Sequence, residues 1–139
     1  MKRSWIKKGT GKNKAAHRKV KLKSVSWWKK AAWKVFSRWI RNRDNWTCFT
    51  CGTRVLGMGM HAGHFVPRIH NATFLSEINV NAQCYVCNIR KKGNAGEYAF
   101  RLIEKYGKDQ FDELVKLGRT YKSFTVPELQ DIIKKYSIE

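Results

Sequence analysis

Two pairs of cysteines with CxxC spacing constrain this chain more than any other feature of its sequence. The first pair is Cys48 and Cys51, and the second pair is Cys84 and Cys87. Four thiolates from two such pairs can surround one zinc ion tetrahedrally. In a reducing compartment this spacing is more typical of metal ligands than of two disulfides, which are the alternative. We therefore expect one structural Zn²⁺ ion that joins two distant segments.

The segment between the two pairs contains residues that suit metal and phosphate chemistry. His61 and His64 lie in it, and Asn88 directly follows the last cysteine. A zinc ion on the four cysteines would fix a strand carrying His64 against a helix carrying Asn88. That arrangement resembles an HNH, or ββα-metal, nuclease. The predicted fold class is α+β, with a zinc-stabilised ββα-metal finger embedded in a mainly helical small domain.

The positive charge of the chain is unevenly distributed. Of its 139 residues, 29 are Lys or Arg, and the formal net charge is +19. Residues 1–43 contain 16 of these 29 cations and no acidic residue, and all six tryptophans lie within the first 46 residues. A basic segment of one sign predicts binding to nucleic acid, with an acidic membrane or protein surface as the alternative.

Composition divides the chain into a basic arm and one compact domain. Residues 1–24 are rich in lysine, contain few apolar residues, and are expected to form a flexible DNA-binding arm. Residues 25–139 are expected to form the helical domain, with the finger at about 45–94. The chain has neither an apolar run long enough to span a membrane nor an apolar signal-peptide stretch. We expect a cytoplasmic protein without a membrane partner.

Hydrophobic periodicity predicts most of the regular structure. Apolar residues at three- and four-residue spacing predict helices over residues 26–43, 95–106, 111–117 and 125–136. Thr125 and Glu128 form a capping-box signature at the start of the last of these helices. We also expect strands over residues 61–68 and 77–80, and a helix that starts near Cys84 and carries Asn88, Lys91 and Lys92.

Hydrolysis of a phosphodiester bond needs a base, a cation and a means of holding the strand. His64 suits the base, because a histidine with its ordinary pKa is mostly neutral at physiological pH. Asn88 suits an oxygen ligand for a catalytic Mg²⁺ or Mn²⁺ ion, and His61 suits a second ligand. The alternatives are that His64 contacts phosphate, that Asn88 only caps a helix, and that His61 is an ordinary loop residue.

A further set of polar and aromatic residues is expected to support binding and the fold. Asn79 is expected to tie the finger loop together by side-chain hydrogen bonds. Trp33 lies off the apolar stripe of its helix, so it is expected either to stack on a base or to pack in the core. Glu97 is a further candidate metal ligand. The expected DNA contacts are Arg38, Arg41, Arg68, His70, Lys91 and Lys92.

Six blocks of sequence, in order, carry a family resemblance. They are residues 36–44, 48–52, 62–65, 70–73, 83–88 and 93–98. Together they resemble the phage NinG (Rap) recombination endonuclease family. The resemblance implies a phage nuclease that acts in the host cytoplasm and cuts branched DNA, including Holliday junctions. The junction between Cys87 and Asn88 also resembles endonuclease VII, which supports Asn88 as a metal ligand.

Other functions remain open at this point. A non-catalytic zinc module that binds DNA or RNA would explain the cysteines and the charge, but not the placement of His64 and Asn88. A nicking nuclease without branch preference would share the same site. Many HNH enzymes have an acid directly before the base histidine, where this chain has Gly63. A resolvase that makes two symmetric cuts would act most simply as a homodimer.

Overall fold

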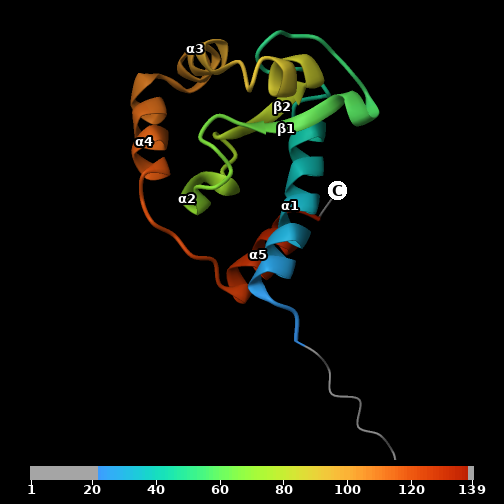
Figure 1. Ribbon diagram of the computed structural model, residues 1–139, viewed down its shortest axis with the longest axis vertical. Coiled ribbons are helices and arrows are strands. Elements are labelled where there is room, and N and C mark those ends of the chain that lie inside the picture. Colours follow the sequence, from blue (N-terminus) through green and yellow to red (C-terminus); the bar gives the residue numbers. More distant parts are fainter. Residues whose placement is uncertain (1–21, 138–139) are drawn as a thin grey trace, which may run out of the picture.

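A computed structural model describes residues 22–137, which form an α+β fold with one small two-stranded sheet (Figure 1). Most of the expected arm, residues 1–21, lies outside the described residues. The helices are α1 (Val25–Arg43), α2 (Asn71–Phe74), α3 (Ala95–Tyr106), α4 (Lys108–Gly118) and α5 (Val126–Tyr136). The remaining elements are β1 (Met60–His64), β2 (Val80–Cys84) and the single helical turns η1 (Gly57–Gly59) and η2 (Val86–Arg90). Within residues 22–137, no helix is long and apolar enough to cross a membrane.

Helix α1 confirms the predicted helix over residues 26–43. It begins at Val25, because the side chain of Ser24 accepts a hydrogen bond from the Trp27 N–H. At its other end, the Asp44 carboxylate forms a salt bridge of 2.7 Å with Arg43. The same carboxylate accepts a hydrogen bond of 2.7 Å from the Ala82 N–H. These interactions fix the end of α1 to strand β2.

The two strands are antiparallel, and their pairing defines two faces of the sheet. His61 lies opposite Gln83, and His64 lies opposite Val80. Successive residues of a strand point to opposite faces. One face, here called the α1 face, contains Met60, Ala62, His64, Val80, Ala82 and Cys84. Ala62 and Val80 pack on α1, whereas Met60, Ala82 and Cys84 pack in the cluster around the cysteines. The opposite face, here called the Asn88 face, contains His61, Gly63, Asn81 and Gln83.

Both strand predictions were wrong in extent. β1 ends at His64, because beyond it the N–H and carbonyl of Val66 hydrogen-bond to the side chain of Asn79, and Pro67 has no N–H. β2 begins at Val80, later than predicted, and all five of its residues are buried. A strand buried on both faces lacks the alternation of apolar and polar residues from which a strand is usually recognised.

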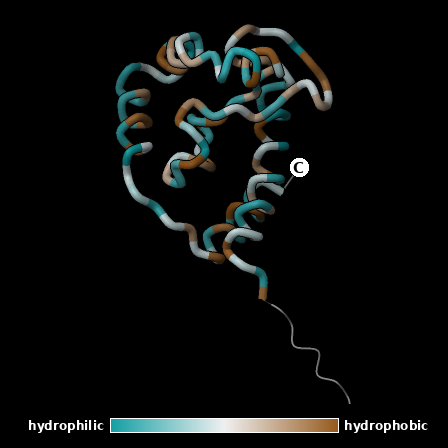
Figure 2. The backbone as a smooth tube through the Cα atoms, in the orientation of Figure 1, coloured by the Kyte–Doolittle hydropathy of each residue, from teal (hydrophilic) through white to brown (hydrophobic). Residues whose placement is uncertain are grey.

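The helices after the sheet follow the predictions more closely. Helix α3 confirms the prediction for residues 95–106, and α4 begins three residues earlier than predicted. The two helices meet at Gly107, whose φ of +86° favours glycine. Apolar and hydrophilic residues recur along both helices (Figure 2). Their apolar sides form one cluster with the sheet end around Tyr98, Leu102 and Leu114.

Helix α5 returns the chain to α1, and the two helices lie side by side (Figure 1). The predicted capping box is confirmed, because the Thr125 side chain accepts a hydrogen bond from the Glu128 N–H and the Glu128 side chain accepts one from the Thr125 N–H. Tyr136 packs edge-on against Phe36 of α1, with ring centroids 4.9 Å apart. Thus α1 is covered by the sheet and by α5.

Candidate functional site

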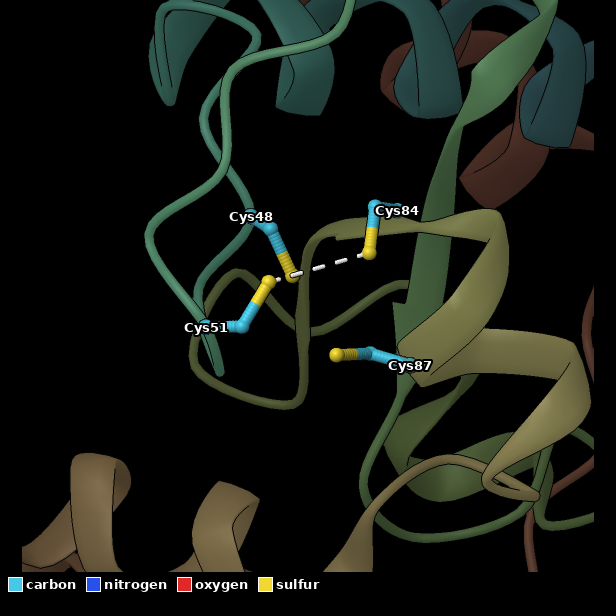
Figure 3. A group of neighbouring side chains, drawn as sticks. All are labelled: Cys48, Cys51, Cys84 and Cys87. Atoms are coloured by element: carbon cyan, nitrogen blue, oxygen red, sulfur yellow. Dashed lines mark hydrogen bonds between the residues drawn. The ribbon is translucent and has the colours of Figure 1, made fainter.

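The four cysteines form a group that could hold a zinc ion, and their sulfur atoms point toward one another (Figure 3). The four sulfur atoms lie within 4.8 Å of one another, and those of Cys51 and Cys84 are 3.8 Å apart. Tetrahedral zinc with Zn–S bonds of about 2.3 Å places its sulfur ligands about 3.8 Å apart. None of the four cysteines forms a disulfide. The geometry therefore matches the predicted zinc ligands.

Local backbone structure brings the sulfur atoms together. Gly52, with a φ of +75°, allows the tight turn after Cys51. Burial raises the pKa of Cys48, but hydrogen bonds from Thr50 and nearby backbone amides outweigh burial and lower this pKa to about 6. Burial raises the pKa of Cys84 to about 12. Burial also raises the pKa of Cys87, so zinc binding would release protons from both Cys84 and Cys87.

His61 and Asn88 meet on the Asn88 face of the sheet. Asn88 Nδ2 lies 2.9 Å from His61 Nδ1. Asn88 belongs to η2, directly after Cys87, so the cysteine group positions it. The predicted helix was wrong in extent, because η2 is a single π-helical turn that ends at Arg90. Lys91 and Lys92 lie beyond this turn, and Lys92 has a φ of +49° that ends the helical path.

Gly63 leaves space for two carboxamide oxygens on the same face. A Cβ atom on Gly63 would overlap Gln83 Oε1 and would lie 3.0 Å from Asn88 Oδ1. The Gln83 side chain is fully buried, and its Nε2 donates a hydrogen bond of 2.9 Å to the Gly93 carbonyl. Its Oε1 has no hydrogen-bond partner. An acid at position 63 would collide with Gln83, which gives a physical reason for the glycine.

Tyr98, on helix α3, stabilises the Asn88 face by hydrogen bonds. Its hydroxyl lies 2.9 Å from the Gly63 carbonyl and 3.2 Å from the Asn79 carbonyl, and it accepts a hydrogen bond of 3.1 Å from Asn81 Nδ2. Burial raises the pKa of Tyr98, so the phenol stays neutral. Asn79 itself donates to the Val66 carbonyl and accepts from the Val66 N–H, which ties the loop after β1 to the start of β2.

His64 lies on the α1 face against two aromatic rings. Its ring stacks on Trp33, with centroids 4.9 Å apart, and on Phe74, with centroids 5.5 Å apart. His64 Nε2 lies 3.0 Å from the Phe74 carbonyl oxygen. Donation to this carbonyl places the proton on Nε2 and leaves Nδ1 as the proton-accepting nitrogen. Burial lowers the pKa of His64 to about 4, and the charge of Arg68 acts in the same direction.

The other predicted site residues do not gather at one place. Trp33 packs against His64 and Phe74, so it belongs to the core at least in part. Glu97 forms a salt bridge of 2.9 Å with Arg101 on α3. Within residues 22–137, the cysteines are the sole group of three or more His, Cys, Asp or Glu side chains placed to hold a metal. The expected DNA contacts lie on α1 (Arg38, Arg41), before α2 (Arg68, His70) and after η2 (Lys91, Lys92).

Sequence reasoning missed the roles of Gln83 and Tyr98. In the sequence, Gln83 belongs to the block at residues 83–88, and Tyr98 lies within the predicted helix over residues 95–106. Their importance depends on the pairing of β1 with β2, which brings Gln83 opposite His61, and on the packing of α3 under Gly63. The sequence carried no local signal for either role, because the burial of Gln83 depends on the pairing of the two strands.

Comparisons with known proteins give the family of the chain. Residues 2–139 match the family model described as bacteriophage lambda NinG protein. The chain is 34% identical over 131 residues to protein ninG of Escherichia phage 933W, covering 90% of this chain and 62% of that relative. It is 32% identical over 125 residues to protein ninG of Escherichia phage lambda, covering 86% of this chain and 58% of that relative.

A third relative gives the same result. Protein ninG of Salmonella phage P22 is 33% identical over 125 residues, which cover 86% of this chain and 59% of that protein. The chain thus spans about three fifths of the length of these curated relatives, whose covered shares are 62%, 58% and 59%. No solved structure matches the chain. The family model and these relatives show that the chain belongs to the NinG family of lambda-type phage proteins.

Proposed function

We propose that this protein is a metal-dependent DNA endonuclease of the HNH type that cuts branched DNA, including Holliday junctions, during phage recombination. The observation that carries the proposal is the arrangement around Gly63. Asn88 Oδ1 lies close to Gly63 on the Asn88 face, and His64, the next residue, lies on the α1 face. A phosphodiester held at this end of β1 would be near both a metal ligand and a base.

Asn88 and His61 are the residues that would hold a catalytic Mg²⁺ or Mn²⁺ ion. Hard cations prefer oxygen ligands such as a carboxamide and keep several waters, whereas an imidazole favours Mn²⁺ over Mg²⁺. The oxygen of Gln83 fits this site as well, because it is buried beside Gly63 without a hydrogen-bond donor. When bound, the ion would stabilise the charge that develops on the phosphate and on the leaving oxygen.

His64 is the proposed general base. The Phe74 carbonyl holds Nε2, so Nδ1 is free to accept a proton from the attacking water. Because the pKa of His64 is lowered to about 4, the imidazole is neutral at physiological pH. The negative charge of a bound phosphate would raise this pKa and so strengthen the base in the complex.

The remaining parts of the chain supply stability and affinity in this proposal. A zinc ion on the four cysteines would hold Asn88 against β1, because Asn88 directly follows Cys87. The 16 cations in residues 1–43, with no acid among them, would bind the DNA backbone by releasing counterions. Two cuts on opposite strands of a junction would be made most simply by a homodimer.

The experiment that tests the proposal is cleavage of matched linear, forked and four-way DNA with Mg²⁺ or Mn²⁺. We expect cleavage that requires the added metal and is faster on forked and four-way DNA than on linear DNA. Equal rates on all three would reduce the function to general nicking. A protein that carries zinc and binds DNA tightly but cuts none of the three with either metal would be a non-catalytic binding module instead.

A further inference from the structure

A hollow of about 230 Å³ opens next to the rings that contact His64. It is lined by Ser26, Lys29, Lys30, Trp33, Arg68 and Phe74. Four of these residues belong to one side of α1, because positions three and four apart lie on the same side of a helix. Trp33 and Phe74 are the two rings that also stack on His64. Trp33 and Phe74 therefore line the hollow and also contact His64, the proposed base.

The lining contains three cations and no acid. Lys29 Nζ donates a hydrogen bond of 2.6 Å to Asn71 Oδ1, which is a neutral partner and leaves the charge of the lysine uncompensated. Burial and the neighbouring Arg68 lower the pKa of Lys29. Like charges gathered at one place repel one another, so this arrangement is destabilising until an anion joins it. The chemistry of the lining therefore indicates an anionic ligand.

The cations lie over aromatic rings. Lys29 Nζ is 4.4 Å from the centroid of the Phe74 ring, and the Arg68 guanidinium is 5.6 Å from the centroid of the Trp33 ring. Aromatic surfaces next to cations are the means by which proteins bind single-stranded nucleic acid without sequence preference, because every base has a face that can stack. The lining thus combines a surface for a base with charges for a phosphate.

The size of the hollow restricts what can enter it. Its volume of about 230 Å³ is below that of pockets for drug-sized molecules, which are typically about 300–1,000 Å³. A paired base is stacked on both sides within the duplex, so its face is not available to Trp33. An unpaired base is free to leave the stack at a small energetic cost. The base of one unpaired nucleotide suits both the size and the chemistry, with its sugar and phosphate at the opening beside the cations.

We propose that this hollow binds one unpaired nucleotide of the DNA substrate. The base packs against Trp33 and Phe74, and the phosphate lies between Lys30 and Arg68. This inference rests on the proposed endonuclease function for its biological meaning, because a site for an unpaired nucleotide next to His64 would select branched DNA that carries unpaired bases over continuous duplex. Binding itself can be measured without cleavage, so the two proposals can fail separately.

The test compares two labelled DNA molecules of equal length, one fully paired and one with a single bulged nucleotide. Affinity is measured by fluorescence anisotropy with the full zinc-loaded chain and no added Mg²⁺ or Mn²⁺. We expect the wild-type protein to prefer the bulged DNA by about tenfold, the contribution of roughly one stacked base. A bulged 2-aminopurine should also be quenched on binding, which reports stacking directly.

The variant is Lys30→Gln with Arg68→Gln, and the control is Lys116→Gln with Lys134→Gln, which removes two exposed cations from α4 and α5. The first pair should abolish the preference and the quenching, whereas the control should keep both. Circular dichroism checks that all variants fold. The proposal is overturned if the wild-type protein binds both DNAs equally. It is also overturned if the Lys30→Gln, Arg68→Gln variant still prefers bulged DNA, or if its affinity for both DNAs falls by the same factor. A preference that persists in a protein without cleavage activity would support the hollow and refute the endonuclease.

Discussion

The two faces of the small sheet are both buried, yet they are built in different ways. The α1 face is apolar and is held by packing against α1 and within the cluster around the cysteines, with His64 as its polar exception. The Asn88 face is polar and is held by hydrogen bonds, such as those from Tyr98 to the Gly63 carbonyl and from Gln83 to the Thr50 hydroxyl. Its exception is Gln83 Oε1, which has no partner. These two exceptions, His64 and Gln83, both belong to the proposed site or lie beside it. Such departures from the surrounding pattern are typical of functional sites.

Removal of zinc should produce the largest effect, and it should first loosen the part of the sheet next to the cysteines. Structural zinc contributes about 10–16 kcal/mol to small metal domains. We expect metal analysis of freshly purified protein to find one zinc ion per chain. With a chelator, amide hydrogen exchange should rise in β2 and η2 before it rises in the α1 segment that packs on α5. Protein purified without zinc, or with a disulfide between any of the four cysteines, would refute the prediction.

Replacement of His64 and of Asn88, one proposed functional residue on each face, should separate the faces by function. His64→Ala should lower the cleavage rate by about 10²–10⁴-fold, the usual contribution of a general base, and should leave zinc content and DNA binding nearly intact. Asn88→Ala should lower the rate and also change the dependence on Mg²⁺ and Mn²⁺ concentration. Gln110→Ala, on the exposed side of α4, is the control. Full cleavage by His64→Ala at saturating Mn²⁺ would contradict the assignment of the base.

Acid should weaken the α1 face through His64. The pKa of this histidine is about 4 in the folded protein, against an ordinary value of 6.5. The unfolded chain therefore binds the proton more tightly than the folded protein does. The contribution of His64 to the free energy of unfolding is fully present above pH 6.5 and is lost as the pH falls toward 4. The loss should be about 3 kcal/mol, measured by urea unfolding across this range. His64→Asn should make the profile flatter, and an unchanged profile would show that His64 does not carry this dependence.

A single methyl group should test the packing of the Asn88 face. Gly63→Ala would overlap Gln83 Oε1, so we expect a loss of about 1–3 kcal/mol in unfolding free energy, as for other overpacked sites. Gly96→Ala is the matched control, because a Cβ on Gly96 meets no atom within 4 Å. Gln83→Ala should relieve the overlap, so the double variant should lose less stability than the two single variants added together. Additive losses would show that the two residues do not interact.

The sequence was most informative where the signal is local. The spacing of the cysteines, the apolar stripe of α1 and the capping box at Thr125 each depend on residues close together in the chain, and each matches the structure. The strand limits failed because β2 is buried on both faces and lacks alternation. The neighbours of Asn88 could not be predicted either, since they depend on a strand register that the sequence does not encode locally.

The position of the cysteines has a consequence for the order in which the protein assembles. The cysteine group joins a turn at residues 48–51 to a turn at residues 84–87, so it closes a loop that contains both strands together with His61 and His64. Closing a loop of this length costs conformational entropy, which metal binding offsets. We expect a newly made chain to form α1 early and to complete the site near Asn88 only after zinc has bound. A nuclease assembled in this order would be harmless to nearby DNA until metal arrives, so metal supply would set the moment at which cutting begins.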